Sequence, residues 1–149
     1  CGGTKWKALE PLVELADLIL LDLKIMDEDK HLRVLGVSLD TVLNNAREIA
    51  RKGKNLWVRT PVIPGYTDSE DNIRRIARFT KNHLPNTTRY DLLAFNNTCS
   101  TKNRRLGQVW GMEEVSRISE ERMDMLAEIA KDEGLDFVHW SGMTESSKQ

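Results

Sequence analysis

Short apolar runs alternate with amphipathic helical patterns along most of this 149-residue chain. The apolar runs predict strands at 18–23, 56–63, 89–95 and 135–140. The intervening patterns predict helices at 5–16, 27–35, 38–50, 67–82 and 119–133. The first run, Leu18 to Leu23, is almost continuously apolar, which is typical of a parallel sheet covered by helices. Connections of a dozen residues or more between the strands indicate right-handed βα units around such a sheet.

Two local signals refine these elements. The segment Thr67-Asp68-Ser69-Glu70 fits a capping box and predicts that the fourth helix opens at Thr67. Pro61 lies near the end of the second strand and cannot donate a hydrogen bond, so we expect strand pairing to weaken there.

Few strands and an abrupt beginning shape the predicted architecture. Three or four parallel strands do not close a barrel and leave unpaired edges. The chain opens with Cys1-Gly2-Gly3-Thr4, without an initiator methionine, and passes at once into a helical pattern. We therefore expect an α/β fold in which residues 1–141 form the C-terminal portion of a partial (β/α) barrel truncated in its N-terminal half. Residues 142–149 would be a disordered tail, and a small open doubly wound sheet is the alternative fold.

Composition excludes several classes of function. The 22 basic and 23 acidic residues are well mixed and leave a net charge of −1, which does not suggest a nucleic-acid or membrane partner. No apolar run approaches the roughly 20 residues that a membrane span requires. The two cysteines make no disulfide framework, and we expect a cytoplasmic protein.

Charged and polar residues gather where the predicted strands end. In parallel βα folds ligands bind at the C-terminal ends of the strands. Asp22 and Lys24 follow the first strand, Arg59 lies near the end of the second, and Asn96 follows the third. This mixture suits a ligand with both a carboxylate and an ammonium group, such as an amino acid. Asp22 and Lys24 could equally form an ordinary surface salt bridge worth ~0–1 kcal/mol.

Arg59 is the more specific signal, because it lies between Val58 and Thr60 in an apolar strand. A buried guanidinium without a partner is costly, so Arg59 predicts a ligand or a carboxylate nearby. The three histidines are less informative. His31 is predicted to be structural, and His83 and His139 lack the neighbours that a zinc site needs.

Three segments resemble, in order and spacing, the C-terminal half of radical S-adenosylmethionine enzymes. They read LLDLKIMDEDKHLRVLGVS, LWVRTPVIPGYTDSEDN and YDLLAFNNTCSTKNRRLG. They carry a D-x-K strand, an R-x-P-V-x-P-G strand and a downstream K-x-x-x-L-G, which together are more specific than any one motif. Over most of residues 1–102 the chain is similar to the glycyl-radical-enzyme activating enzymes, of which pyruvate formate-lyase activating enzyme is the best known.

This resemblance implies a function for the intact protein. A four-iron four-sulfur cluster would cleave S-adenosylmethionine reductively, and the resulting radical would activate a glycyl radical enzyme, with an electron donor such as flavodoxin. By position, Asp22 and Lys24 would lie beside the methionine part of S-adenosylmethionine, and Arg59 near its carboxylate. Asn96 would bind ribose or a carboxylate, and Asp22 could help to hold a monovalent cation.

The chain departs from that family in three respects, one of which is that Cys99 and Lys102-Asn103 replace the usual G-K-Y before the final L-G. The cluster motif C-x-x-x-C-x-x-C is absent, since the only cysteines are Cys1 and Cys99, and the G-G-E strand motif that holds the amino group of the cofactor is also absent. Where the family often ends the third strand with Tyr-His, this chain has Phe95-Asn96, and asparagine does not titrate. We therefore expect the chain alone to be inactive, with no catalytic residue of its own.

Two other functions fit the same residues. Lys24 at a strand end could be the Schiff-base lysine of an aldolase-type lyase, with Asp22 as its proton shuttle. A non-catalytic interaction fragment, whose open sheet edges pair with another chain, is the third interpretation.

Overall fold

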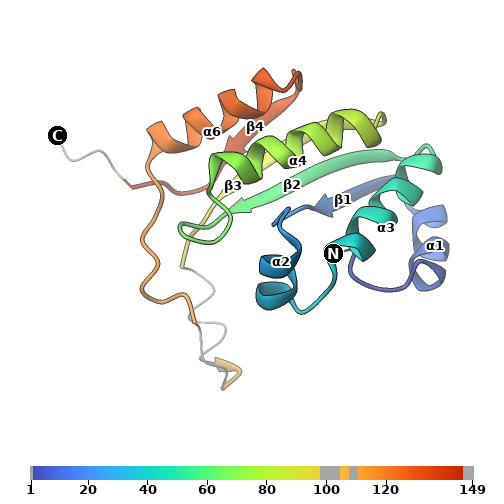
Figure 1. The fold of residues 1–149 in the computed structure, drawn as a ribbon, viewed down its shortest axis with the longest axis horizontal. Helices are drawn as coiled ribbons and strands as arrows, with labels where there is room; N and C mark the ends of the chain where they lie inside the picture. Colours follow the sequence, from blue (N-terminus) through green and yellow to red (C-terminus); the bar gives the residue numbers. More distant parts are fainter. Residues whose placement is uncertain (1, 98–104, 108–110, 146–149) are drawn as a thin grey trace.

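The fold is described by a computed structural model over residues 2–97, 105–107 and 111–145 (Figure 1). One parallel sheet has the order β1-β2-β3-β4 and consists of β1 (Leu18–Asp22), β2 (Asn55–Val62), β3 (Thr87–Ala94) and β4 (Val138–Ser141). The helices are α1 (Trp6–Leu15), α2 (Glu28–Leu35), α3 (Leu39–Arg51), α4 (Glu70–His83) and α6 (Glu120–Asp132). The predicted alternation of parallel strands with helices is confirmed. None of these helices is long and apolar enough to cross a membrane.

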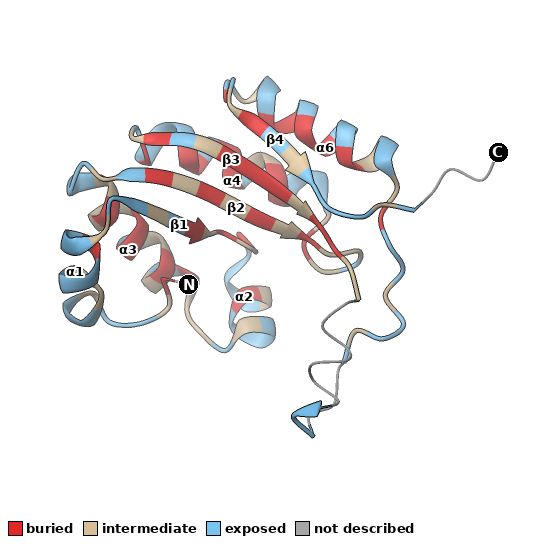
Figure 2. Cartoon of the chain, turned by 180° about the vertical axis from the view of Figure 1, so that it is seen from behind, coloured by how far each residue is buried: buried red, intermediate tan, exposed pale blue. Residues whose placement is uncertain are grey.

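The large helices cover one face of the sheet and leave the other uncovered (Figures 1 and 2). Each strand pairs with the next strand in the sequence, and connections of one hand then place every crossover helix on the same face. Side chains of β2 alternate accordingly: Leu56, Val58 and Thr60 are buried under the helices, whereas Trp57 and Arg59 are partly exposed. The doubly wound alternative is wrong, because it requires helices on both faces.

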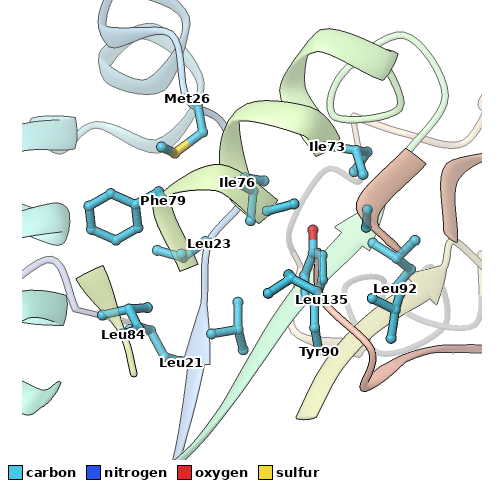
Figure 3. Packing of buried hydrophobic residues seen from close by; sticks show 14 of the residues in the cluster. Leu21, Leu23, Met26, Ile73, Ile76, Phe79, Leu84, Tyr90, Leu92 and Leu135 are labelled. Carbon is cyan, nitrogen blue, oxygen red and sulfur yellow. The ribbon is translucent and has the colours of Figure 1, made fainter. Parts of the chain in front are cut away.

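The core lies between the sheet and its helices (Figure 3). Its sheet side is formed by side chains with at most 2% exposure, namely Leu21, Leu23, Leu56, Val58, Tyr90 and Leu92. Its helix side comes from α3, α4 and α6, through Val42, Ala46, Ile73, Ile76, Ala77, Met123, Leu126 and Ala130. Burial of this apolar surface provides the main stabilisation of the fold.

The beginning of α4 differs from the prediction. The helix starts at Glu70 with Ser69 as its N-cap, whose hydroxyl accepts from the backbone N–H of Asn72. Thr67 is buried instead; its hydroxyl donates to the Pro61 carbonyl and accepts from the Ile63 N–H. The predicted capping box at Thr67 is therefore wrong, because this hydroxyl closes the turn that precedes the helix.

Pro61 sits where β1 has already ended. The β1–β2 pairing stops at Asp22 opposite Arg59, whereas β2 and β3 remain paired as far as Val62 opposite Ala94. The Arg59 carbonyl faces β1, since it accepts from the Leu23 N–H, and alternation turns the nitrogen of Pro61 the same way. Loss of pairing is confirmed on the β1 side, where proline needs no partner.

Some of the predictions concern residues that lie at the ends of the described ranges or outside them. Cys1, Cys99 and Lys102 lie outside the described residues, as does 146–149 of the predicted tail. Before that, the Glu145 N–H donates to the Ile118 carbonyl at 2.9 Å. The boundary at residue 141 between the barrel portion and a disordered tail stays a prediction.

β1 is an edge strand with apolar side chains on the uncovered face. Leu18 and Leu20 are 40% and 44% exposed, and Leu12 and Leu15 of α1 are more exposed still. A groove of about 250 Å³ between α1 and β1 is lined by apolar side chains that include Leu9, Leu12, Leu18, Leu20 and Ile49. This edge combines exposed apolar surface with backbone groups that no strand of the described residues pairs.

Candidate functional site

Asp22, Lys24 and Arg59 meet at the C-terminal edge of the uncovered sheet face. Asp22 lies opposite Arg59 in the β1–β2 register. Arg59 Nε and Nη2 lie 2.9 and 2.8 Å from Asp22 Oδ1, and Lys24 Nζ lies 3.9 Å from Asp22 Oδ2. These side chains are between 23% and 33% exposed. We call these three residues the charged cluster.

The geometry of the charged cluster gives Arg59 one of the two partners that the sequence predicted for it, a carboxylate. This carboxylate is that of Asp22, which is bound more closely by Arg59 than by Lys24. Two cations and one carboxylate leave a formal charge of +1 at a site that solvent can reach. Such a cluster can accept an anionic group, while Asp22 offers an acceptor to an ammonium group.

Buried hydrogen bonds hold the strand end from which Lys24 projects. The Leu23 N–H donates to the Arg59 carbonyl at 3.0 Å, and the Thr60 hydroxyl donates to the Leu23 carbonyl at 2.6 Å. Since Thr60 has only one hydrogen to give, the Tyr90 hydroxyl donates to it across 3.1 Å. Burial raises the pKa of the Tyr90 phenol far above its ordinary value, and the contact with Thr60 offsets this only in part.

A second polar group on the same face was missed by the sequence reasoning. Asp91 is 6% exposed and lies opposite Arg59 in the β2–β3 register. Arg89 Nε donates to both Asp91 carboxylate oxygens, at 2.8 and 2.9 Å, and its guanidinium lies 4.9 Å from the centre of the Trp57 ring. The available signal was the spacing of Arg89 and Asp91, because strand residues two apart share a face.

The register continues the row of charges across the sheet. Asp22, Arg59, Asp91 and His139 are successive neighbours on β1, β2, β3 and β4. Acidic and basic groups therefore alternate over the first three strands on the uncovered face. Cross-strand pairs of opposite charge stabilise this arrangement.

The structure also places Asn96 and His31, which the sequence analysis singled out. Asn96 is half-buried and follows β3 by two residues, at the edge of the sheet where the charged cluster lies. His31 is buried, and its Nδ1 donates to the Val37 carbonyl at 2.7 Å, so its predicted structural role is confirmed. A cation site at Asp22 stays a prediction. Within residues 2–97, 105–107 and 111–145, no three His, Cys, Asp or Glu side chains are grouped so as to hold a metal ion.

Known proteins with similar sequences are named as activating enzymes. The chain is 36% identical over 131 residues to the indoleacetate decarboxylase activating enzyme of Tractidigestivibacter scatoligenes, covering 87% of this chain and 41% of that protein. It is 33% identical over 112 residues to the pyruvate formate-lyase-activating enzyme of Staphylococcus aureus, covering 75% of this chain and 44% of that enzyme. The chain is a homologue of pyruvate formate-lyase-activating enzymes. It spans less than half the length of these curated relatives.

Solved structures agree with the homology at the level of the fold. A domain of pyruvate-formate lyase-activating enzyme from Bacteroides vulgatus matches 91% of this chain and 74% of that domain, with a TM-score of 0.72 and 24% identity. A radical SAM methyltransferase from Sphaerobacter thermophilus matches 91% of this chain and 38% of that protein, with a TM-score of 0.65 and 16% identity. No family model matches the chain. The chain therefore has the α/β fold of radical SAM structures.

Proposed function

We propose that the charged cluster binds the methionine part of S-adenosylmethionine in a glycyl-radical-enzyme activating enzyme. The supporting observation is the meeting of Arg59, Lys24 and Asp22 on the uncovered face, at the edge where parallel sheets bind ligands. Arg59 and Lys24 would hold the carboxylate of the ligand, and Asp22 would accept from its ammonium group. Asn96 would hydrogen-bond the ribose or the carboxylate from the end of β3.

The residues of this chain do not fit an iron–sulfur cluster in the same way. A four-iron four-sulfur cluster would supply the electron that cleaves S-adenosylmethionine, but the sequence has two cysteines and no C-x-x-x-C-x-x-C motif. We therefore propose that this chain alone binds the cofactor without cleaving it. In the wider function, the protein substrate is a glycyl radical enzyme, the electron donor is a protein such as flavodoxin, and the compartment is the cytoplasm.

Titration calorimetry with S-adenosylmethionine and its decarboxylated analogue tests the proposed carboxylate site. Arg59→Gln should weaken S-adenosylmethionine binding about 10- to 100-fold, the usual effect of losing a charge-assisted hydrogen bond. The decarboxylated analogue should bind wild type weakly and lose little further affinity in Arg59→Gln. Arg78→Gln, on the outer side of α4, is the matched control and should bind like wild type. Equal affinity of wild type and Arg59→Gln for S-adenosylmethionine would contradict the proposal.

Anaerobic reconstitution with iron and sulfide tests the second part of the proposal. The chain should bind no stoichiometric cluster, as measured by iron content and by the visible absorption of the reconstituted protein. Formation of one four-iron four-sulfur cluster per chain would refute it.

A further inference from the structure

Lys24 lies two residues beyond the last residue of β1, so strand pairing does not fix its backbone on the side that leads to Met26. The segment Lys24–Met26 is instead held from across the core by one side chain of α4, that of Asn72. We propose that Asn72 is a positioning residue, which sets the place of Lys24 in the charged cluster and thereby the affinity for the carboxylate of the ligand. This inference rests on the proposed function for its ligand, but not for its structural basis.

Asn72 makes three hydrogen bonds with the backbone. Its Nδ2 donates to the Lys24 carbonyl at 2.8 Å and to the Thr67 carbonyl at 3.0 Å, and its Oδ1 accepts from the Met26 N–H at 2.8 Å. Only an amide with this orientation satisfies two carbonyls and one N–H together. The side chain therefore fastens both sides of Ile25 to the start of α4.

The position of Asn72 makes this attachment rigid. The residue is 8% exposed and lies in the first turn of α4, where Ser69 caps the helix through the Asn72 N–H. On the other side of β1's end, Thr60 holds the Leu23 carbonyl. The backbone on each side of Lys24 is thus fixed by a buried side chain, one from β2 and one from α4.

A small cavity lies against the same side chain. It has a volume of about 210 Å³ and is lined by Ile25, Asp27, Lys30, Tyr66, Ser69, Asp71, Asn72 and Arg75. Its polar lining allows water to enter once the Asn72 amide is removed. Shortening Asn72 should therefore release the Lys24–Met26 segment to solvent, without forcing the core apart.

Asn45 provides a matched comparison on α3. It is 4% exposed, and its Nδ2 donates to the Gly2 and Thr4 carbonyls at 2.6 and 2.7 Å. Asn45 thus ties backbone to a helix in the same manner, but at the amino-terminal segment rather than at the charged cluster. Asn72→Ala and Asn45→Ala should lower the melting temperature by similar amounts. A difference in ligand affinity between the two variants then reflects where each asparagine lies and not a general loss of stability.

The first experiment needs no ligand. In Asn72→Ala the Met26 amide should exchange with deuterium at least tenfold faster than in wild type, because its acceptor is lost. The rate of Lys24 acetylation by acetic anhydride, relative to that of Lys54, should change as well. Asn72→Asp should keep Met26 protected and still alter Lys24, since a carboxylate retains the acceptor and loses the donor. Asn45→Ala should leave both residues unchanged.

The second experiment measures S-adenosylmethionine affinity by calorimetry in a double-mutant cycle. Asn72→Ala should weaken binding roughly five- to tenfold, the usual effect of one lost hydrogen bond, whereas Asn45→Ala should not. In the Lys24→Ala background, Asn72→Ala should weaken binding no further, because its effect passes through Lys24. Unchanged affinity in Asn72→Ala, or the same loss with and without Lys24, would overturn the inference.

Failure of the proposed function gives a different result. If the wild-type chain does not bind S-adenosylmethionine, the proposed ligand is wrong, and the exchange and acetylation rates decide the role of Asn72 alone. Unchanged rates at both Met26 and Lys24 in Asn72→Ala would then overturn the positioning role, and changed rates at both residues would support it.

Discussion

Thr60 joins three strands through one hydroxyl group, directly beneath the charged cluster. It is fully buried on β2, donates to the Leu23 carbonyl after β1, and accepts from the Tyr90 hydroxyl of β3. The hydroxyl hydrogens of Thr60 and Tyr90 thus both have an acceptor within the core. The position of the strand ends thus depends on a polar chain that apolar packing alone would not specify.

Thr60→Val should therefore be strongly destabilising despite its similar shape. The substitution leaves the Leu23 carbonyl and the Tyr90 hydroxyl buried without these partners, which costs about 1–3 kcal/mol for each group. The double variant Thr60→Val/Tyr90→Phe should lose less than the sum of the two single variants, because phenylalanine leaves no hydroxyl to satisfy. Urea unfolding measures all three; strict additivity would contradict the hydrogen-bonded chain.

Tyr90 should also make stability depend on alkaline pH. In the unfolded chain its phenol ionises as the pH rises through about 10, whereas burial keeps the folded phenol protonated to a higher pH. Because only the unfolded state releases this proton, the free energy of unfolding should fall above pH 10, by up to about 1.4 kcal/mol per pH unit. Tyr90→Phe should remove this part of the decline, measured by urea unfolding between pH 9 and 11. Tyr66→Phe should retain it.

The sequence predicted that Asp22, Lys24 and Arg59 meet, because strand ends of a parallel sheet share an edge. It did not predict that Asp22 pairs chiefly with Arg59, since that depends on the β1–β2 register. Asp91 was missed for a related reason. Its place beside Arg59 depends on an irregularity in the β2–β3 register between Leu56 and Trp57, for which the sequence gives no local signal.

At the scale of single elements, the start of α4 shows how two neighbouring hydroxyls differ. Ser69→Ala should cost about 1 kcal/mol, the usual effect of losing an N-cap. Thr67→Val should cost more, about 2–3 kcal/mol, because the Ile63 N–H loses a buried partner. Thr67→Ser keeps the hydroxyl and serves as the control. Thermal unfolding of the three variants checks this order, and a larger loss in Ser69→Ala than in Thr67→Val would contradict it.

Most elements could be read from the sequence, and the errors lie at their ends. The predicted ends of the second and third helices are correct to within one residue, because Gly36 and Gly53 follow them with φ of 71° and 68°, a conformation that favours glycine. The last strand was predicted to start at Leu135 but begins at Val138. Leu135 is buried in the core before any strand pairing, and apolar character alone does not separate packing from pairing.

At the scale of the whole molecule, the β1 edge should govern self-association. Its outer backbone groups and the exposed Leu18 and Leu20 side chains form a surface on which another strand can pair. Leu20→Lys should lower the fraction of dimer and larger species at high protein concentration, measured by sedimentation velocity. Leu32→Lys, at an exposed position of α2, is the control and should associate like wild type. Equal association of wild type and Leu20→Lys would exclude this edge.

The strand order also determines how the sheet can form during translation. Because β2 pairs with β1, β3 with β2 and β4 with β3, each strand after β1 meets a partner already made when it leaves the ribosome. Each new strand pairing then closes a loop of only one βα unit, which keeps the entropic cost of loop closure small. Asp22 and Arg59 both precede α4, so this ion pair can form as soon as β2 has emerged, whereas Lys24 is held in place only after Asn72 of α4 has been made. The complete charged cluster can therefore exist while β4 and α6 are still being synthesised.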